Sequence, residues 1–153
     1  METIKPYQTI EDYREKYTVF LAGHTRDDWR DQLVEYFDSE KFDDLILINP
    51  VYDDWESLGE EDPDNPKMVK QWDWEHEGLI AADLKVFNFS EHVAPVSLYE
   101  LGRYQLKGKT IILVEDKNEK AGYLRWIACK YGLTTVENLK ELSSLISMKY
   151  HIS

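Results

Sequence analysis

The glutamate at position 100 lies where a side chain can take part in chemistry. It follows the apolar run 84–89 and falls in the first turn of a predicted helix over 97–107. The carboxyl ends of parallel strands border the crevice in which open α/β sheets bind ligands. A glutamate there can face the reacting carbon of a ligand rather than bulk solvent. The simpler interpretation of Glu100 is an acid that the dipole of the helix stabilises.

The elements that must position this glutamate alternate between strand and helix. Short apolar, β-rich runs predict strands, and the segments between them have apolar residues at helical spacing. The predicted strands are 17–22, 45–48, 83–89, 109–114 and 133–136, and the predicted helices are 27–37, 68–80, 97–107, 119–131 and 138–148. Continuous apolar strands separated by helices are typical of a parallel sheet that is covered on both faces.

This pattern predicts an α/β fold: a doubly wound five-stranded parallel sheet in a flavodoxin-like three-layer sandwich with strand order 2-1-3-4-5. The length predicts a single domain over 1–153, in which 1–16 is an amphipathic lead-in segment. In this strand order the loops that follow the first three strands meet at one crevice. These loops contain residues 23–26, 49–50 and 90–100.

The composition and net charge of the chain argue against nucleic acids and membranes as binding partners. The net charge is −12 and no stripe of Lys or Arg occurs, which argues against a nucleic-acid polymer as partner. No apolar run approaches the ~20 residues that span a bilayer. The N-terminus lacks the pattern of a secretory signal, so the sequence predicts a cytoplasmic protein that does not bind membranes. The single cysteine, Cys129, is expected on a buried helix face.

A series of short motifs lies in order along residues 17–115. They are Val-Phe-Leu-Ala-Gly at 19–23, Trp29, Asn-Pro at 49–50 with Asp-Trp at 54–55, Gln-Trp-Asp-Trp-Glu at 71–75, Ala-Asp at 82–83, and Pro-Val-Ser-Leu-Tyr-Glu-Leu-Gly at 95–102. In this order and spacing they resemble the nucleoside 2-deoxyribosyltransferase-like family, and the chain is identified as a divergent member. The resemblance implies an enzyme, either a nucleoside deoxyribosyltransferase or a nucleoside or nucleotide N-glycosidase.

The resemblance implies that Glu100 is the nucleophile and that Glu75 is the acid near the leaving base. Cleavage of an N-glycosidic bond can use two such carboxyl groups, because one captures the anomeric carbon as a covalent glycosyl-glutamate while the other supplies a proton to the base. The (deoxy)ribosyl group then passes to another nucleobase or to water. Glu100 would be ionised and Glu75 protonated, in environments that separate their pKa values. Two carboxyl groups suffice, so no cofactor or metal is implied.

Further residues are predicted to hold the substrate, a nucleoside or nucleotide. In the loop after the first strand, Arg26 can make a bidentate phosphate contact, and helix amides near Ser97 can add donors. The alternative is that Thr25 or Asp27 caps the next helix and that Arg26 is a solvated side chain. The predicted substrate-binding residues are Gly23, Thr25, Arg26, Asn49, Trp55 and Ser97.

The long polar loop over 51–66 is expected to be functional or mobile. Its acids lack the spacing of a calcium-binding loop and indicate solvated carboxylates. Within it, Trp55 is the tryptophan that we expect to cover the base. Tryptophans at helical spacing are more typical of a core, and we expect this of Trp29, Trp72 and Trp74. We expect Asp83 to cap the entry to a strand and His24 to have no catalytic role.

The chain departs from the family pattern at several positions. Ala94 stands six positions before the predicted nucleophile, where the best-known transferases carry an aspartate, and Thr18 or Val19 replaces a tyrosine of the first strand. The C-terminal Asn-x-Met segment that completes a neighbouring subunit's pocket is also missing. Transfer to a base, which would make a free nucleobase a second partner, and transfer to water both stay open. The resemblance implies a homodimer or larger assembly, and the alternative function is a non-catalytic nucleotide-binding or sensing module on the same fold.

Overall fold

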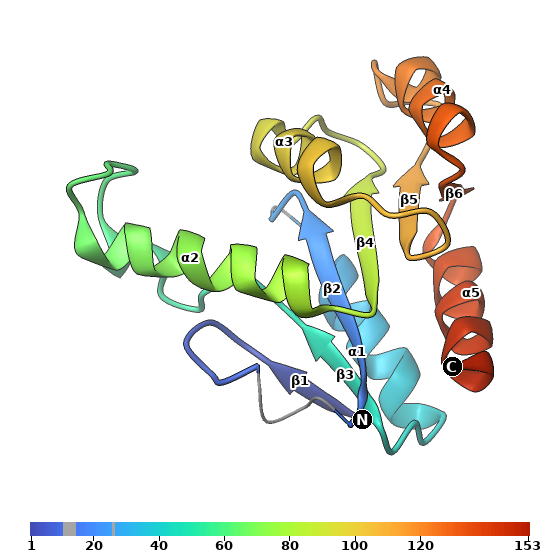
Figure 1. Ribbon diagram of the computed structural model, residues 1–153, viewed down its shortest axis with the longest axis horizontal. Coiled ribbons are helices and arrows are strands. Elements are labelled where there is room, and N and C mark those ends of the chain that lie inside the picture. The colour runs from blue at the N-terminus through green and yellow to red at the C-terminus, as the bar shows by residue number, and fades with distance from the viewer. Residues whose placement is uncertain (11–14, 26) are drawn as a thin grey trace.

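A single parallel sheet organises the protein in the computed structural model (Figure 1). The structure describes residues 1–10, 15–25 and 27–153. The strands of this sheet are β1 (Glu2–Ile4), β2 (Tyr17–Gly23), β3 (Leu45–Ile48), β4 (Leu84–Phe89), β5 (Thr110–Val114) and β6 (Thr134–Val136). The helices are α1 (Trp29–Ser39), α2 (Pro66–Ala81), α3 (Pro95–Tyr104), α4 (Ala121–Tyr131) and α5 (Leu139–Ile152).

The sheet has one strand more than the sequence predicts. Over the described residues its order is β1-β3-β2-β4-β5-β6, so the predicted five strands keep the predicted order and a sixth joins at the edge. The added strand β1 lies in the segment predicted as a lead-in, where Ile4 pairs with Ile48 of β3 and is completely buried. Three residues with one buried apolar side chain give too short a pattern for strand periodicity to reveal.

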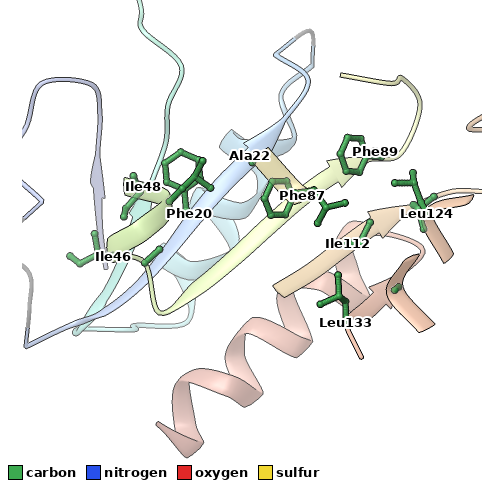
Figure 2. Close-up of a cluster of buried hydrophobic side chains, with 14 of the residues drawn as sticks. Phe20, Ala22, Ile46, Ile48, Phe87, Phe89, Ile112, Leu124 and Leu133 are labelled. Carbon is green, nitrogen blue, oxygen red and sulfur yellow. The ribbon is translucent and has the colours of Figure 1, made fainter. Parts of the chain in front are cut away.

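Helices cover both faces of the sheet, because the apolar strands alternate their side chains between two cores. Phe20, Phe87 and Ile112, from three neighbouring strands, share one core with Leu124 of α4 (Figure 2). The helices α2 and α3 also pack on this face, while α1 and α5 pack on the other. The alternation explains why every residue of β4 is buried. Within the described residues, none of the helices combines the length and apolar character needed to cross a membrane.

Two helix boundaries bear directly on the crevice. The helix α2 begins at Pro66 after Asn65, whose side chain accepts a hydrogen bond from the amide of Lys67. The helix α3 begins at Pro95, two residues earlier than predicted, because proline at the first helical position has a suitable fixed φ and needs no hydrogen-bond donor. Glu100 therefore lies in the second turn of α3 and not in the first, which weakens the explanation of this glutamate as a dipole-stabilised acid.

Of two further predictions about single residues, one agrees with the structure and one does not. Asp83 joins the starts of β2 and β4, since its Oδ2 accepts hydrogen bonds from both the amide and the hydroxyl of Thr18, as the capping prediction requires. The prediction that Cys129 is buried is wrong, because Cys129 is exposed. Helix α4 turns Leu124 and Ala128 toward the core, and the next position, Cys129, is rotated about 100° away from that face.

Candidate active site

A cavity of about 790 Å³ opens at the carboxyl ends of the central strands. Its lining includes Pro50 after β3, His24 after β2, His92 after β4 and Lys117 after β5, so it runs along the sheet edge across four neighbouring strands. Residues of the helices α2 and α3 also line it. The loops that follow the first three predicted strands meet here, as the predicted strand order requires.

A larger cavity, of about 980 Å³, lies at the opposite edge of the sheet, near Thr18 and Asp83. This edge carries the amino ends of the parallel strands, whereas ligands of open α/β sheets bind at the carboxyl ends. Asp83 is already bound to Thr18 in that cavity. The smaller cavity is therefore the better candidate for chemistry.

The two glutamates singled out by the sequence line the same cavity from different helices, Glu75 from α2 and Glu100 from α3. Burial raises the pKa of Glu75 to about 7, against the lowering effects of a hydrogen bond from Gln71 and of the charge of Arg30. Burial, and after it the charge of Glu75, raises the pKa of Glu100 to about 8. At neutral pH the pair thus retains a proton. The environments do not separate the two pKa values as predicted, because the higher pKa belongs to the buried Glu100 and not to the half-buried Glu75, which was expected to hold the proton.

A buried guanidinium from α1 faces this pair. Arg30 is 3% exposed, and its Nε, Nη1 and Nη2 donate hydrogen bonds of 3.1, 2.9 and 3.1 Å to the carbonyl oxygens of Leu21, His24 and Gly23. Its charge lowers the pKa of both Glu75 and Glu100. Burial lowers the pKa of Arg30 itself to about 10, so it stays cationic at neutral pH.

Sequence reasoning did not identify Arg30 as a site residue. A signal was present, because Arg30 lies on the same helical face as Leu33 and Phe37, and all three are buried. A charged residue on the apolar face of a helix must find partners inside the protein. In this protein the partners are the strand-end carbonyls of β2 and the two carboxyl groups of the cavity.

The loop after β2 is held tightly where it enters the cavity. Gly23 has a φ of +130°, and a Cβ atom there would lie 2.5 Å from the carbonyl oxygen of Asn88 in β4, so only glycine fits. The carbonyl oxygen of His24 accepts hydrogen bonds from Trp29 Nε1 and Arg30 Nη1. The ring of His24 is buried and lines the cavity, although the sequence predicted only a loop residue.

The structure gathers most of the predicted substrate-binding residues around the two glutamates. Those that line the cavity are Gly23, Thr25, Trp55 and Ser97. Asn49 is not brought to it; its side chain accepts a hydrogen bond from the amide of Val51 and forms a turn, and Pro50 lines the cavity instead. Arg26 lies outside the described residues.

The capping alternative for the loop after β2 is wrong. Asp28 is the residue at the N-cap of α1, so neither Thr25 nor Asp27 holds that position. Thr25 is exposed and lines the cavity, whereas Asp27 comes within 3.6 Å of His24 Nδ1. Thr25 is therefore free of a capping role and remains a candidate contact for a ligand.

The tryptophans separate into core and cavity residues. Trp29 and Trp74 are buried, as their helical spacing predicts, and the indole N–H of each donates to a backbone carbonyl. For Trp72 the core prediction is wrong, because this side chain is half-buried and lines the cavity. Trp55 belongs to a short 3₁₀ helix, Trp55–Leu58, within the loop that was predicted to lack regular structure. Trp55 and Trp72 thus contribute two aromatic rings to the lining.

The end of the cavity near β5 is rich in charged residues. Lys117 pairs with Glu91 and Glu115, and the ring of His92 packs edge-to-face on His24 at 5.6 Å. Among the residues that the structure describes, no cluster of three or more His, Cys, Asp or Glu side chains is arranged to hold a metal ion.

Comparison with models of known protein families gives a match. The family model described as "Nucleoside 2-deoxyribosyltransferase like" matches residues 16–118, which is more than half of the chain. The matched region runs from β2 through β5 and contains Glu75, Glu100 and Arg30. No curated protein matches this chain.

Proposed function

The chain belongs to the nucleoside 2-deoxyribosyltransferase-like family, and we propose from this that it cleaves the N-glycosidic bond of a (deoxy)nucleoside or nucleotide through a covalent glycosyl-glutamate intermediate. The (deoxy)ribosyl group passes to another nucleobase or to water. The observation that carries the proposal is the pair of carboxyl groups, the half-buried Glu75 and the buried Glu100, that line one cavity at the carboxyl edge of the sheet. Perturbed carboxyl pKa values in a cavity are typical of acid–base chemistry.

In the first step, a carboxylate oxygen of Glu100 attacks C1′ of the sugar. The C1′–N bond breaks as the C1′–O bond forms, and its electron pair goes to the base. Glu75 donates its proton to the base nitrogen or oxygen that acquires this charge. The products of the step are a sugar ester of Glu100, a neutral base and an ionised Glu75.

This step requires that the shared proton of the pair resides on Glu75. Two features favour that arrangement in the complex with substrate. The positive charge that develops at C1′ stabilises an ionised Glu100, and a base placed beside Glu75 offers an acceptor for its O–H. In the free protein the higher pKa, about 8, belongs to Glu100, and Arg30 lowers the pKa of both carboxyl groups, so it is the substrate that must move the proton to Glu75. The raised pKa of Glu75, about 7, keeps a usable proton there near neutral pH.

In the second step, the acceptor attacks C1′ from the side that the base has left, and Glu75 takes up the acceptor's proton. The sugar ester of Glu100 is broken and both glutamates return to their starting states. Two displacements at C1′ give net retention of configuration. The acceptor is a second base or water, and Ala94, which lines the cavity where the best-known transferases carry an aspartate, makes water the acceptor to test first.

The elements that carry the lining residues support one orientation of the substrate in the cavity. The aromatic rings of Trp55 and Trp72 lie on the side of β3 and α2, where Glu75 also lies, and suit a stacked base. Thr25 and Ser97 lie on the side of β2 and α3 and suit the sugar hydroxyls or a 5′-phosphate.

Incubation of the purified protein with a panel of nucleosides and nucleotides tests the proposal. Chromatography should detect release of free base, and this release should be lost in Glu100→Ala and reduced at least 100-fold in Glu75→Gln. Full activity in Glu100→Ala would show that Glu100 is not the nucleophile. A wild-type protein that binds one of these ligands tightly and cleaves none would favour the sensing module.

A second incubation separates a transferase from a hydrolase. Deoxyinosine is supplied together with free adenine, and the products are resolved by chromatography. A transferase forms deoxyadenosine, whereas a hydrolase forms only hypoxanthine and free deoxyribose. The absence of the aspartate at position 94 leads us to expect hydrolysis as the faster reaction.

A further inference from the structure

Gln71 is a completely buried polar residue of α2 that lies one helical turn before Glu75. Its side-chain nitrogen donates two hydrogen bonds, one of 2.9 Å to the carbonyl oxygen of Pro50 and one of 2.7 Å to Oε1 of Glu75. The carbonyl oxygen of Pro50 can only accept, so the orientation of the Gln71 amide is fixed with its nitrogen toward both partners. Gln71 thereby links the end of β3 to the Glu75 carboxyl group.

The other side of the same amide is left without a partner. Oε1 of Gln71 is buried and accepts no hydrogen bond from the described residues. A buried acceptor without a donor is unfavourable for folding, and an apolar side chain of similar size would avoid that cost. The stability of the fold alone therefore does not account for an amide at this position.

The hydrogen bond distinguishes the two oxygens of the Glu75 carboxyl group. A protonated carboxyl group carries a single hydrogen, and the oxygen that faces the N–H of Gln71 must present a lone pair to it. The hydrogen is then excluded from Oε1 and resides on Oε2. Within the described part of the chain, Gln71 is the only residue that forms a hydrogen bond with this carboxyl group.

We propose that Gln71 is a positioning residue, which occupies Oε1 of Glu75, leaves the proton of the acid on Oε2 and so directs it toward the leaving base. The inference rests on the proposed function, in which Glu75 is the acid. It adds that the orientation of the Glu75 carboxyl group depends on the hydrogen bond between Gln71 and the Pro50 carbonyl oxygen after β3, as well as on the position of Glu75 in α2.

Other charged and titratable groups also act on Glu75 and must stay unchanged in a test. They are Arg30 from α1, Glu61 from the loop after β3, Glu100 from α3 and Tyr7 from the segment after β1. A change confined to Gln71 leaves all four in place. The hydrogen bond from Gln71 favours the ionised form of Glu75, so its removal raises the pKa of Glu75 above about 7.

Gln71→Met tests the inference, because methionine has a similar length and no hydrogen-bond donor. Carboxyl carbon NMR of protein with ¹³C-labelled glutamate should show the titration of Glu75 shifted upward by about one pH unit. The signal is assigned by its absence in Glu75→Gln. In kinetics, kcat should fall by about tenfold with KM little changed, and the alkaline limb of the kcat profile should move upward with the titration. A purely structural role for Gln71 would lower activity without moving the alkaline limb.

The chain offers a matched control on α1. Gln32 Nε2 donates a 2.7 Å hydrogen bond to Asp28 Oδ1, with the same four-residue spacing, on the protein surface. Gln32→Met should leave both the titration of Glu75 and the pH profile unchanged. If Gln71→Met does not fold, Gln71→Asn replaces it, because the shorter amide cannot span to Glu75 and the same upward shift is expected.

The outcomes separate this inference from the proposed function. An unshifted titration of Glu75 in the Gln71 variant overturns the inference whether or not the protein cleaves nucleosides. If the titration of Glu75 is shifted in the Gln71 variant but the wild-type protein cleaves no nucleoside, the hydrogen-bond coupling is supported and the proposed function is contradicted. A shifted titration with an unmoved alkaline limb in an active protein also overturns the inference, because Glu75 would then not be the acid that limits turnover.

Discussion

At the scale of single residues, the buried carboxyl group of Glu100 lowers the free energy of unfolding as pH rises. Burial raises the pKa of Glu100 to about 8 from its ordinary value of 4.5, so the folded protein holds a proton that the unfolded chain releases at lower pH. A group whose folded pKa is raised destabilises the fold as pH rises from about 4.5 to about 8. Below that range the penalty disappears, and above it the penalty is complete.

Glu100→Gln should remove this penalty. At pH 8 we expect the variant to be more stable than the wild type by a few kcal/mol, with the difference vanishing near pH 4.5. Thermal unfolding followed by circular dichroism across this pH range measures the effect. Glu77→Gln, at an exposed position of α2, serves as control and should follow the wild type. Identical pH dependence in Glu100→Gln and the wild type would contradict the burial of an ionisable group at position 100.

At the scale of elements, Arg30 joins α1 to the end of β2. Replacement by methionine removes a hydrogen-bond donor from each of three carbonyl oxygens, of which that of His24 keeps Trp29 Nε1, and we expect a loss of about 3 kcal/mol in the free energy of unfolding. The same change removes the cation that lowers the pKa of Glu75 and Glu100, so both carboxyl groups should titrate at higher pH. Urea unfolding and carboxyl NMR measure the two effects. Retained stability together with unchanged titration would show that Arg30 neither anchors β2 nor acts on the pair.

The approach of β2 to β4 at Gly23 gives a second prediction at this scale. Gly23→Ala places a Cβ atom 2.5 Å from the Asn88 carbonyl oxygen at a φ of +130°, so the backbone must shift. We expect a loss of about 2–4 kcal/mol in stability and at least tenfold weaker substrate binding, because this loop lines the cavity.

Gly122→Ala is the matched control for this change. Gly122 lies in α4 with no atom near the position of an added Cβ, so alanine should stabilise the helix by about 0.5–1 kcal/mol. Chemical denaturation and ligand titration compare the two variants. Equal stability of the Gly23 and Gly122 variants would refute the steric role of Gly23.

At the scale of the whole molecule, the sequence predicts the central architecture because its strands are continuously apolar. Leu-Ile-Leu-Ile at β3 can only be a strand buried on both faces, and such strands separated by helices require a covered parallel sheet. The edge strand β1 escaped prediction because its pairing with β3 is a tertiary contact that three residues do not encode locally.

The candidate site follows partly from the same reasoning. The strand order places the loops after β2, β3 and β4 together, and the family motifs point to Glu75 and Glu100. The residues that surround the two glutamates are less accessible to sequence reasoning. Arg30 and Gln71 act through hydrogen bonds to backbone carbonyl oxygens, which no sequence pattern encodes, although Arg30 does lie at helical spacing with the buried Leu33 and Phe37. Trp72 and Trp74 lie two positions apart on α2 and so point to different sides of the helix, Trp72 toward the cavity and Trp74 toward the core.

Assembly is a prediction at this scale that follows from family membership. We expect a homodimer or larger homo-oligomer, so light scattering at micromolar concentration should give at least twice the mass of the chain. The helix α3 exposes the apolar side chains of Tyr99 and of Val96, which also lines the cavity, and these suit a contact between copies. A monomer mass over the whole concentration range would contradict the expectation and leave the cavity as a complete site within one chain.

The proposed mechanism requires a covalent bond between Glu100 and the anomeric carbon, and mass spectrometry can detect that bond. The protein is mixed with a nucleoside that carries fluorine at C2′, which destabilises positive charge at C1′ and slows breakdown of the ester. After acid quenching and digestion, the proposed mechanism predicts one added sugar on the peptide that contains Glu100, and no added sugar on the same peptide of Glu100→Gln. Release of base without any adduct at Glu100, or an adduct on a different residue, would contradict it.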